Sequence, residues 1–370
     1  MTEQHAAHRP PQPAAEAPWH LVLGRRDPAR MAEIRQQVEA HPGAARRPLH
    51  WHVPDRGEQT PATALAAAQA ARADGGIVIA VGGDGTINAT CQASLATGVP
   101  MAVLCQGTFN FFCRQQGLPQ ALDAALDALV DALQAGQLRP VRVGDINGQV
   151  FLVNASLGLY PHLLRDREQA TRKLGRHQWV ALGAGVLSLL KWRGSQLWRL
   201  RERDAHGHER QRMALASTLF VSNNALQLQQ VGVEPAEAAG RGALVASTLG
   251  PRGVWSTLTL LWQAWRQQLS EHEAVDSFAC TALTVEGARW RASRMVRVAF
   301  DGERRAMALP LRFSVRPDPL WLVATPEAPA LSEAPVTTRP SGRTIENAAA
   351  FARQALVVPR RRAPIEVVGT

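Results

Sequence analysis

Residues 77–90 read IVIAVGGDGTINAT, an apolar run that passes directly into Gly82, Gly83, Asp84, Gly85 and Thr86. The apolar run predicts a buried strand, and the residues after the glycines resume a helical pattern. A helix that begins beyond a parallel strand presents free N–H groups, and glycine lets its backbone approach an anion closely. Taken alone, the stretch predicts either a phosphate-binding loop or a tight turn that its polar residues merely cap.

The chain around this stretch alternates strand patterns with helical patterns. We expect strands at WHLVLG (19–24), PLHWHV (48–53), GIVIAVG (76–82) and PMAVLCQ (100–106), and helices over 61–73, 87–97 and 120–134. This alternation is typical of βαβ units. It predicts an α/β nucleotide-binding domain with a parallel sheet over residues 19–140.

The pattern changes after residue 140. VRVGDINGQVFLVNAS (141–156) predicts a hairpin that turns at Asn147-Gly148, and most later segments are strand-like. We therefore expect a mostly antiparallel, β-rich second domain over 141–318, with helical segments at 165–192 and 253–270. Residues 1–18 and 326–370 lack periodicity, and we expect a disordered N-terminus and a flexible Arg/Pro-rich tail.

Composition and charge restrict the class of protein. The chain has 370 residues, 46% of them hydrophobic, and a formal net charge of +10, which favours an anionic partner. Nucleic-acid-binding motifs are absent, so we expect no nucleic-acid partner. The longest apolar run, 179–190, is shorter than the roughly 20 residues that span a bilayer. Residues 1–18 contain no continuous apolar core of the kind that a signal peptide requires, so we expect none. The four cysteines have no framework spacing, which predicts free thiols in a cytoplasmic protein.

A second loop favours the phosphate-binding interpretation of the first. The strand PMAVLCQ runs into GTFNFF, so Gly107, Thr108 and Asn110 occupy the equivalent place one strand later. Ligands of open α/β sheets collect beyond the carboxyl ends of the strands, where these two loops would lie together. No Gly-Lys-Ser/Thr follows, which excludes a Walker loop. The two loops predict a nucleotide site of another kind.

Five segments together resemble the diacylglycerol kinase catalytic-domain family, which includes kinases of sphingosine, ceramide and bacterial lipids. They are VGGDGTINA (81–89), QGTFNFFCRQQGLP (106–119), FLVNASLGLYP (151–161), LFVSNNALQL (219–228) and VRVAFDGE (296–303). The resemblance covers roughly residues 19–325. The combination is more specific than any one motif, because NAD kinases and phosphofructokinases share only the first loop convincingly.

The resemblance implies an ATP-dependent lipid kinase that uses Mg²⁺ and transfers the γ-phosphate to a lipid hydroxyl, such as that of diacylglycerol. It implies phosphate contacts from Gly82, Gly83, Asp84, Gly85, Thr86, Gly107, Thr108 and Asn110. Across the cleft, Asp301 is the expected general base, and Glu303 its support or a magnesium contact. The strand LWLVA (320–324) would return to the first domain. The enzyme would be cytoplasmic and would meet its lipid at an anionic membrane surface; monomer and homodimer both stay open.

Two alternatives stay open, one because the chain departs from the family pattern at three places and one because NAD kinases share the first loop. Arg25 and Arg26 follow the first strand where relatives carry an Asn-Pro and a Ser-Gly loop, Arg241 stands where an acidic residue is common, and Phe111 replaces an aspartate. A catalytically weak nucleotide- or lipid-binding regulator is one alternative. An NAD kinase-like enzyme is the other, although residues 107–119 follow the lipid-kinase pattern. No motif identifies the lipid.

Two further groups of residues have ordinary interpretations as well as functional ones. His206 and His208 could ligate a metal, but a solvated hairpin turn is the expected explanation because no third ligand is nearby in sequence. Trp255, Trp262 and Arg266 fall on one stripe of the expected helix at 253–270 and would form an interfacial patch.

Overall fold

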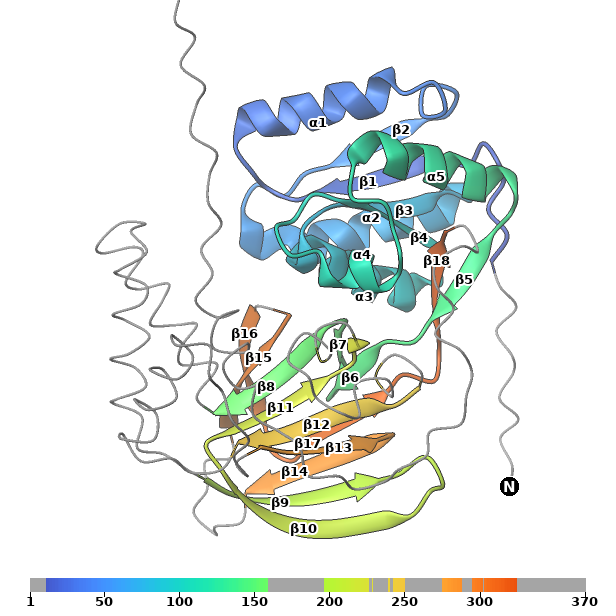
Figure 1. Cartoon of the computed structure of the whole chain (residues 1–370). Coiled ribbons are helices and arrows are strands. Elements are labelled where there is room, and N and C mark those ends of the chain that lie inside the picture. Colours follow the sequence, from blue (N-terminus) through green and yellow to red (C-terminus); the bar gives the residue numbers. More distant parts are fainter. Residues whose placement is uncertain are drawn as a thin grey trace, which may run out of the picture.

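The computed structural model describes residues 11–158, 196–225, 228, 239, 242–249, 275–287, 295–301 and 303–324. An α/β unit packs on a β-rich unit in which two sheets face each other (Figure 1). This confirms the predicted fold class. The helices expected at 165–192 and 253–270, the tryptophan stripe, Arg241, Gly302 and the tail after residue 325 lie outside the described residues.

The first sheet has six strands in the order β2-β1-β3-β4-β18-β5. The strands are β1 (Trp19–Leu23), β2 (Leu49–His52), β3 (Ile77–Gly82), β4 (Met101–Cys105), β18 (Leu320–Val323) and β5 (Leu138–Val141). Strands β2, β1, β3, β4 and β18 run parallel, and β5 pairs antiparallel with β18. Strands β1, β3 and β4 are fully buried because helices cover both faces of the sheet.

Helices pack on both faces of this sheet. They are α1 (Pro28–Ala40), α2 (Thr60–Asp74), α3 (Asp84–Thr97), α4 (Phe111–Gln115) and α5 (Leu122–Gln134), with a short 3₁₀ turn η1 (Gly57–Gln59) before α2. Helices α1 and α5 share one core with Leu21, Ile79 and Val81, and α2 and α3 share the other with Val22 and Val78. Side chains alternate between the two faces along each strand, so a single buried strand supplies both cores.

The β-rich unit is built from two antiparallel sheets. One has the order β10-β9-β14-β17-β6-β7 and the other β13-β12-β11-β8-β15-β16. The strands are β6 (Gly144–Ile146), β7 (Gln149–Phe151), β8 (Asn154–Gly158), β9 (Gln196–Arg203), β10 (Glu209–Ala216), β11 (Thr218–Ser222), β12 (Leu244–Leu249), β13 (Val275–Cys280), β14 (Ala282–Gly287), β15 (Met295–Phe300), β16 (Glu303–Ala308) and β17 (Leu311–Val315). Their inner faces form one core that includes Phe151, Trp198 and Phe313. The predicted hairpin is present, because Asn147 and Gly148 both have positive φ between β6 and β7.

Two sequence expectations need correction. Ala17 is buried and the carbonyl of Pro18 accepts the N–H of Ile77, so the expected N-terminal disorder does not extend to residue 18. Cys105 and Cys113 form a disulfide, where we expected thiols. The end of β4 and the first turn of α4 bring these two Cα atoms to 6.7 Å, within the range that a disulfide bridges. The free cysteines of the described residues, Cys91 and Cys280, are buried.

Candidate functional site

Three loops meet at the carboxyl edge of the first sheet. Because β1, β3 and β4 are parallel neighbours, the chain leaves all three strands at this edge. The loop after β1 begins at Gly24, the loop after β3 contains Gly83, and the loop after β4 contains Gly107. Backbone hydrogen bonds from Gly24 N to Val81 O and from Gln106 N to Gly82 O fasten them together. This edge is where open α/β sheets bind ligands.

The two predicted glycine loops touch through their backbones. A Cβ atom at Gly83 would lie 3.2 Å from Cα of Gly107, and one at Gly107 would lie 2.8 Å from Cα of Gly83. Gly107 therefore has no room for a side chain, and a side chain at Gly83 would force Gly107 to shift, whatever the loops bind. A Cβ at Gly82 would lie 2.6 Å from Cβ of Thr86, and one at Gly24 would collide with the Thr86 hydroxyl. Thr86 thus packs against the ends of β1 and β3.

The second loop holds its polar residues in different ways. Asn110 adopts the left-handed conformation at φ 49° and caps α4, and its side-chain amide donates to Gln120 Oε1 at 2.9 Å. A Cβ at Gly107 would collide with the carboxamide oxygen of Asn110, so this side chain packs directly against the loop. Thr108, in contrast, is exposed at the mouth, and the rings of Phe109 and Phe111 stack beside it at 5.8 Å.

Asp84 is the acidic residue at the centre of the two loops. It begins α3, and burial raises the pKa of its carboxyl to about 6, with a further contribution from the Asp301 carboxylate. The backbone N–H groups of Asn110 and Phe111 act in the opposite direction. Its Oδ1 is buried and has no hydrogen-bond partner among the described residues. A carboxyl with this pKa exchanges a proton near neutral pH, as acid–base catalysis requires.

Asp301 has a different environment from the one that a general base needs. Its Oδ2 accepts the side-chain amide of Asn88 and the N–H of Leu152, both at 2.7 Å. Its Oδ1 accepts the N–H groups of Val153 and Asn154 at 2.9 and 3.1 Å. Four donors occupy the roughly four acceptor positions of a carboxylate, so no position is left for a substrate proton. Burial raises the pKa of Asp301, and these donors counteract that rise.

These contacts favour a second role for Asp301, and its expected role as general base stays a prediction. The φ of 46° at this residue turns its side chain back toward β8 and the segment before it. There it ties β15 of the β-rich unit to Asn88 on α3 of the α/β unit. Sequence reasoning missed Asn88 because its partner lies 213 residues away. Asp301 has the geometry of a residue that positions the two units.

Glu303, the second expected acid, does reach the glycine loops. A Cβ at Gly85 would lie 3.9 Å from Glu303 Oε1, and Glu303 itself is exposed as the first residue of β16. The structure thus brings Asp84, Gly85 and Glu303 to one place. Thr86 and Asn110 point elsewhere.

Two arginines that follow the first strand reach the second loop. Arg26 donates to the carbonyl of Gln106, and Arg30 donates to Gln106 Oε1 at 3.2 Å. Burial lowers the pKa of Arg26, and the nearby charge of Arg30 lowers it further. Arg30 already pairs with Glu33 at 2.6 Å, so Arg26 is the guanidinium that a further anion beside the glycine loop would stabilise. Arg25, the neighbour in sequence, instead donates to the carbonyl of Asp55.

The segment after β11 joins the β-rich unit to the second loop. The side chain of Asn224 donates to the carbonyl of Phe111 at 3.2 Å, and Gln115 donates to the carbonyl of Asn223 at 3.4 Å. Both asparagines are buried. The sequence signal was the SNN motif at 222–224, whose resemblance to the family was visible but whose contacts were not.

The fold and this edge define a class: an α/β unit with paired glycine loops beyond its parallel strands, joined to a β-sandwich. Residues 32–146 match the family model of the diacylglycerol kinase catalytic domain. A Bacillus subtilis (strain 168) protein named diacylglycerol kinase is 36% identical over 129 residues, which span 34% of this chain and 42% of the relative. Residues 32–146 are therefore similar in sequence to the diacylglycerol kinase catalytic domain, and the chain spans less than half the length of this relative.

A solved structure extends the likeness to the rest of the fold. The crystal structure of a diacylglycerol kinase from Bacillus anthracis str. Sterne has a TM-score of 0.54 and 16% identity, over 85% of this chain and 98% of that chain. At this identity the comparison supports the shared fold. Among the described residues, no helix combines the length and apolar character needed to cross a bilayer.

Proposed function

We propose that the protein is an ATP-dependent lipid kinase that transfers the γ-phosphate to a lipid hydroxyl such as that of diacylglycerol. One observation carries the proposal: two glycine loops, an arginine pair and the carboxyls of Asp84 and Glu303 converge at one edge of the sheet. The names of the family and of the relatives support the same class of reaction.

The phosphates would bind at the glycine loops. The first turn of α3 offers N–H groups and a positive dipole end, and Gly83 and Gly107 let the two loops approach each other closely beside it. Thr108 offers an exposed hydroxyl, and Arg26 and Arg30 offer positive charge. These groups would hold the triphosphate and balance the charge that develops on the transferred phosphoryl group.

The residues present fit Mg²⁺ in the manner typical of phosphoryl transfer. Mg²⁺ is usually bound by one or two carboxylates together with substrate phosphates and water, not by a cage of protein ligands. Asp84 has a buried oxygen without a partner, and Glu303 is exposed beside Gly85. Glu303 would supply a ligand. When bound, the ion neutralises phosphate charge.

Asp84 is our choice of general base. Its carboxylate would take the proton of the lipid hydroxyl as that oxygen forms its bond to the γ-phosphorus and ADP leaves. Its pKa of about 6 leaves it mostly ionised at neutral pH and still basic enough to accept the proton. Asp301 would act only by positioning, through Asn88 and through the N–H groups of residues 152–154.

The lipid would be met at an anionic membrane surface. Leu197, Met213 and Leu215 are exposed on the outer face of β9 and β10, where Leu197 lies opposite Leu215. Arg199 and Arg201 stand on the same face and pair with Glu286. Exposed apolar side chains beside arginines suit the interface of a bilayer.

Changing Met213 and Leu215 to Asp should reduce co-flotation with phosphatidylglycerol vesicles, whereas equal flotation would remove this face from the proposal.

One experiment tests the proposed reaction. Purified protein is incubated with labelled ATP, Mg²⁺ and separate samples of diacylglycerol, sphingosine, ceramide and phosphatidylglycerol, with NAD as a further acceptor. We expect label in a lipid. Label in NAD would replace the proposal with an NAD kinase-like enzyme. If the protein binds ATP or lipid but transfers label to no acceptor, it would instead be a nucleotide- or lipid-binding regulator.

Three variants separate binding from chemistry. Gly83→Val should abolish ATP binding, because its side chain would push the two loops apart, whereas Gly57→Val is the control, since a Cβ at Gly57 meets nothing within 4 Å.

Asp84→Asn should bind ATP and lose about 10² to 10⁴ in turnover. Normal turnover of Asp84→Asn would exclude Asp84 as the base.

A further inference from the structure

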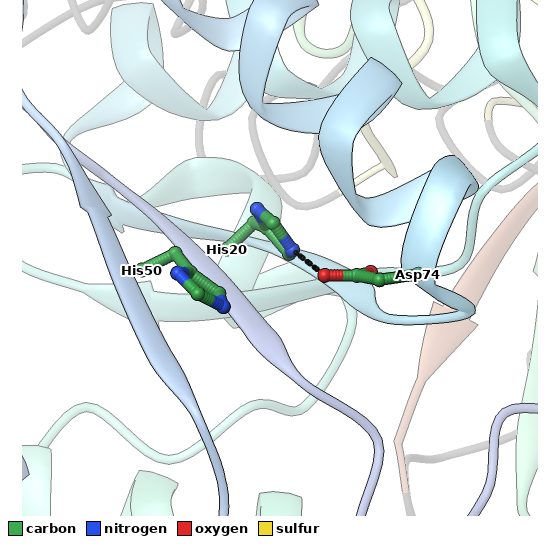
Figure 2. Close-up of side chains that lie close together, drawn as sticks. All are labelled: His20, His50 and Asp74. Carbon is green, nitrogen blue, oxygen red and sulfur yellow. Dashed lines mark hydrogen bonds and ion pairs between the residues drawn. The ribbon is translucent and has the colours of Figure 1, made fainter.

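Three histidines and an aspartate gather at the opposite end of the same sheet. His20 on β1 is paired in register with His50 on β2, and His52 lies two residues further along β2. Asp74 ends α2 and reaches back to the same place. The rings of His20 and His50 stack with centroids 4.7 Å apart (Figure 2). His20 is 3% exposed, whereas His50 and Asp74 are open to solvent.

His20 is the centre of a chain of hydrogen bonds. Its Nε2 lies 2.8 Å from Asp74 Oδ2, and its Nδ1 lies 3.2 Å from His52 Nε2. A neutral imidazole donates from one nitrogen only. When Nε2–H donates to the carboxylate, Nδ1 accepts from His52. Side-chain ligand atoms of His20, His50 and Asp74 all lie within 4.8 Å of one another, the sole such group among the described residues.

We propose that His20, His50 and Asp74 form a binding site for a divalent transition metal ion, with Zn²⁺ as the best-fitting ion. Two imidazole nitrogens and one carboxylate oxygen are a ligand set that Zn²⁺ prefers, and a water molecule completes the tetrahedron. The site would be distinct from the one proposed for phosphoryl transfer. His20 precedes Gly24 by four residues of extended chain, which separates the two sites by about 13 Å.

The geometry needs only a small adjustment. Bonds of about 2.1 Å in a tetrahedron place ligand atoms about 3.4 Å apart, so the most distant pair must approach by no more than roughly 1.4 Å. His50 is exposed, and rotation of its side chain supplies this movement. His20 and Asp74 already stand closer than that, at 2.8 Å, because a proton now lies between them.

The metal ion would take the position of the proton between His20 and Asp74. His20 and His52 would each keep one hydrogen but carry it on the other ring nitrogen, so no proton would be lost. His20 would ligate through Nε2 and carry its hydrogen on Nδ1, from which it would donate to Nε2 of His52. His52 would then carry its own hydrogen on Nδ1. His52 would thus orient the ligand without touching the metal, as the partners of metal-bound histidines commonly do. Bound metal would fasten the edge strand β2 and the end of α2 to β1.

Calorimetric titration of ZnCl₂ into chelator-treated, tag-free full-length protein tests the site. Wild type should bind one zinc ion that Mg²⁺ does not displace. His50→Gln and Asp74→Asn should each weaken binding by at least about tenfold, and His52→Leu by about 10- to 100-fold. His41→Gln is the matched control, because His41 also meets a carboxylate, Asp127, at 3.0 Å and belongs to no such three-residue group among the described residues. Its affinity should equal that of wild type.

A second readout guards against variants that fold poorly. Zinc should raise the melting temperature of wild type and His41→Gln, and should not raise that of His50→Gln, whose side chain is exposed. Circular dichroism before titration verifies the fold of each variant. Absence of saturable one-site binding in wild type would overturn the proposal. So would His50→Gln and Asp74→Asn proteins that bind zinc as wild type does.

Discussion

At the scale of single residues, Asp301 stabilises the fold through its four donors. Asp301→Asn would keep the shape but turn an NH₂ group toward N–H groups that now meet a carboxylate oxygen. We expect a loss of about 3 kcal/mol in the free energy of unfolding, measured by urea titration, because hydrogen bonds to charged groups are the strong ones. Glu303→Gln is the control, since Glu303 is exposed. Equal stability of the two variants would contradict the positioning role.

Also at this scale, the raised pKa of Asp84 makes stability depend on pH. Its pKa rises from 3.8 unfolded to about 6 folded, so between these values the native state holds more protons than the unfolded state. Stability from this group is therefore present below about pH 4 and is lost as pH rises through about 6. Asp84→Asn cannot titrate. As pH rises from 4 to 6, the free energy of unfolding of this variant should therefore increase relative to that of wild type. A constant difference between the two proteins over this range would refute the shift.

At the scale of elements, prediction succeeded where periodicity was strong. The helix expected at 120–134 is α5, and its buried residues include Leu126, Leu129 and Leu133. We predicted no helix at α1, because it buries only Ile34 and Val38; the usable signal was the Asp27 cap followed by Pro28. The glycine loops could be found from sequence, since each is contiguous. The Asp301 contacts could not, since they join residues about 150 or more positions apart.

At the scale of elements, the disulfide at the second loop should stabilise the fold. Cys105 and Cys113 close a short loop around Gly107 and Asn110. The bond lowers the conformational entropy of the unfolded chain, which should raise the free energy of unfolding by about 2.5 kcal/mol. Urea titration of wild type with and without reductant should differ by that amount. The Cys105→Ala, Cys113→Ala double variant should not respond to reductant. A wild type that is equally indifferent would show that the loop holds without the bond.

At the scale of the whole molecule, the sheet of the α/β unit is completed by a strand from near the end of the described chain. β18 lies between β4 and β5, and among the described strands it is the sole partner of β5. Leu320, Leu322 and Ala324 belong to the core under α2 and α3, and Val323 belongs to the core under α1 and α5. The α/β unit is thus completed by a segment that follows the entire β-rich unit.

A fragment of residues 1–146 should therefore fail to fold cooperatively. Although it contains every residue matched by the family model, it leaves β4 as an apolar edge, deprives β5 of its partner and removes side chains from both cores. Joining residues 316–325 to this fragment through a flexible linker should restore a single urea transition, because the added strand supplies both missing pairings. The same linker carrying Leu322→Asp is the control, since Leu322 is fully buried. Cooperative unfolding of the bare fragment would show that the α/β unit stands without β18. The return of the chain would then serve to place the β-rich unit against the glycine loops.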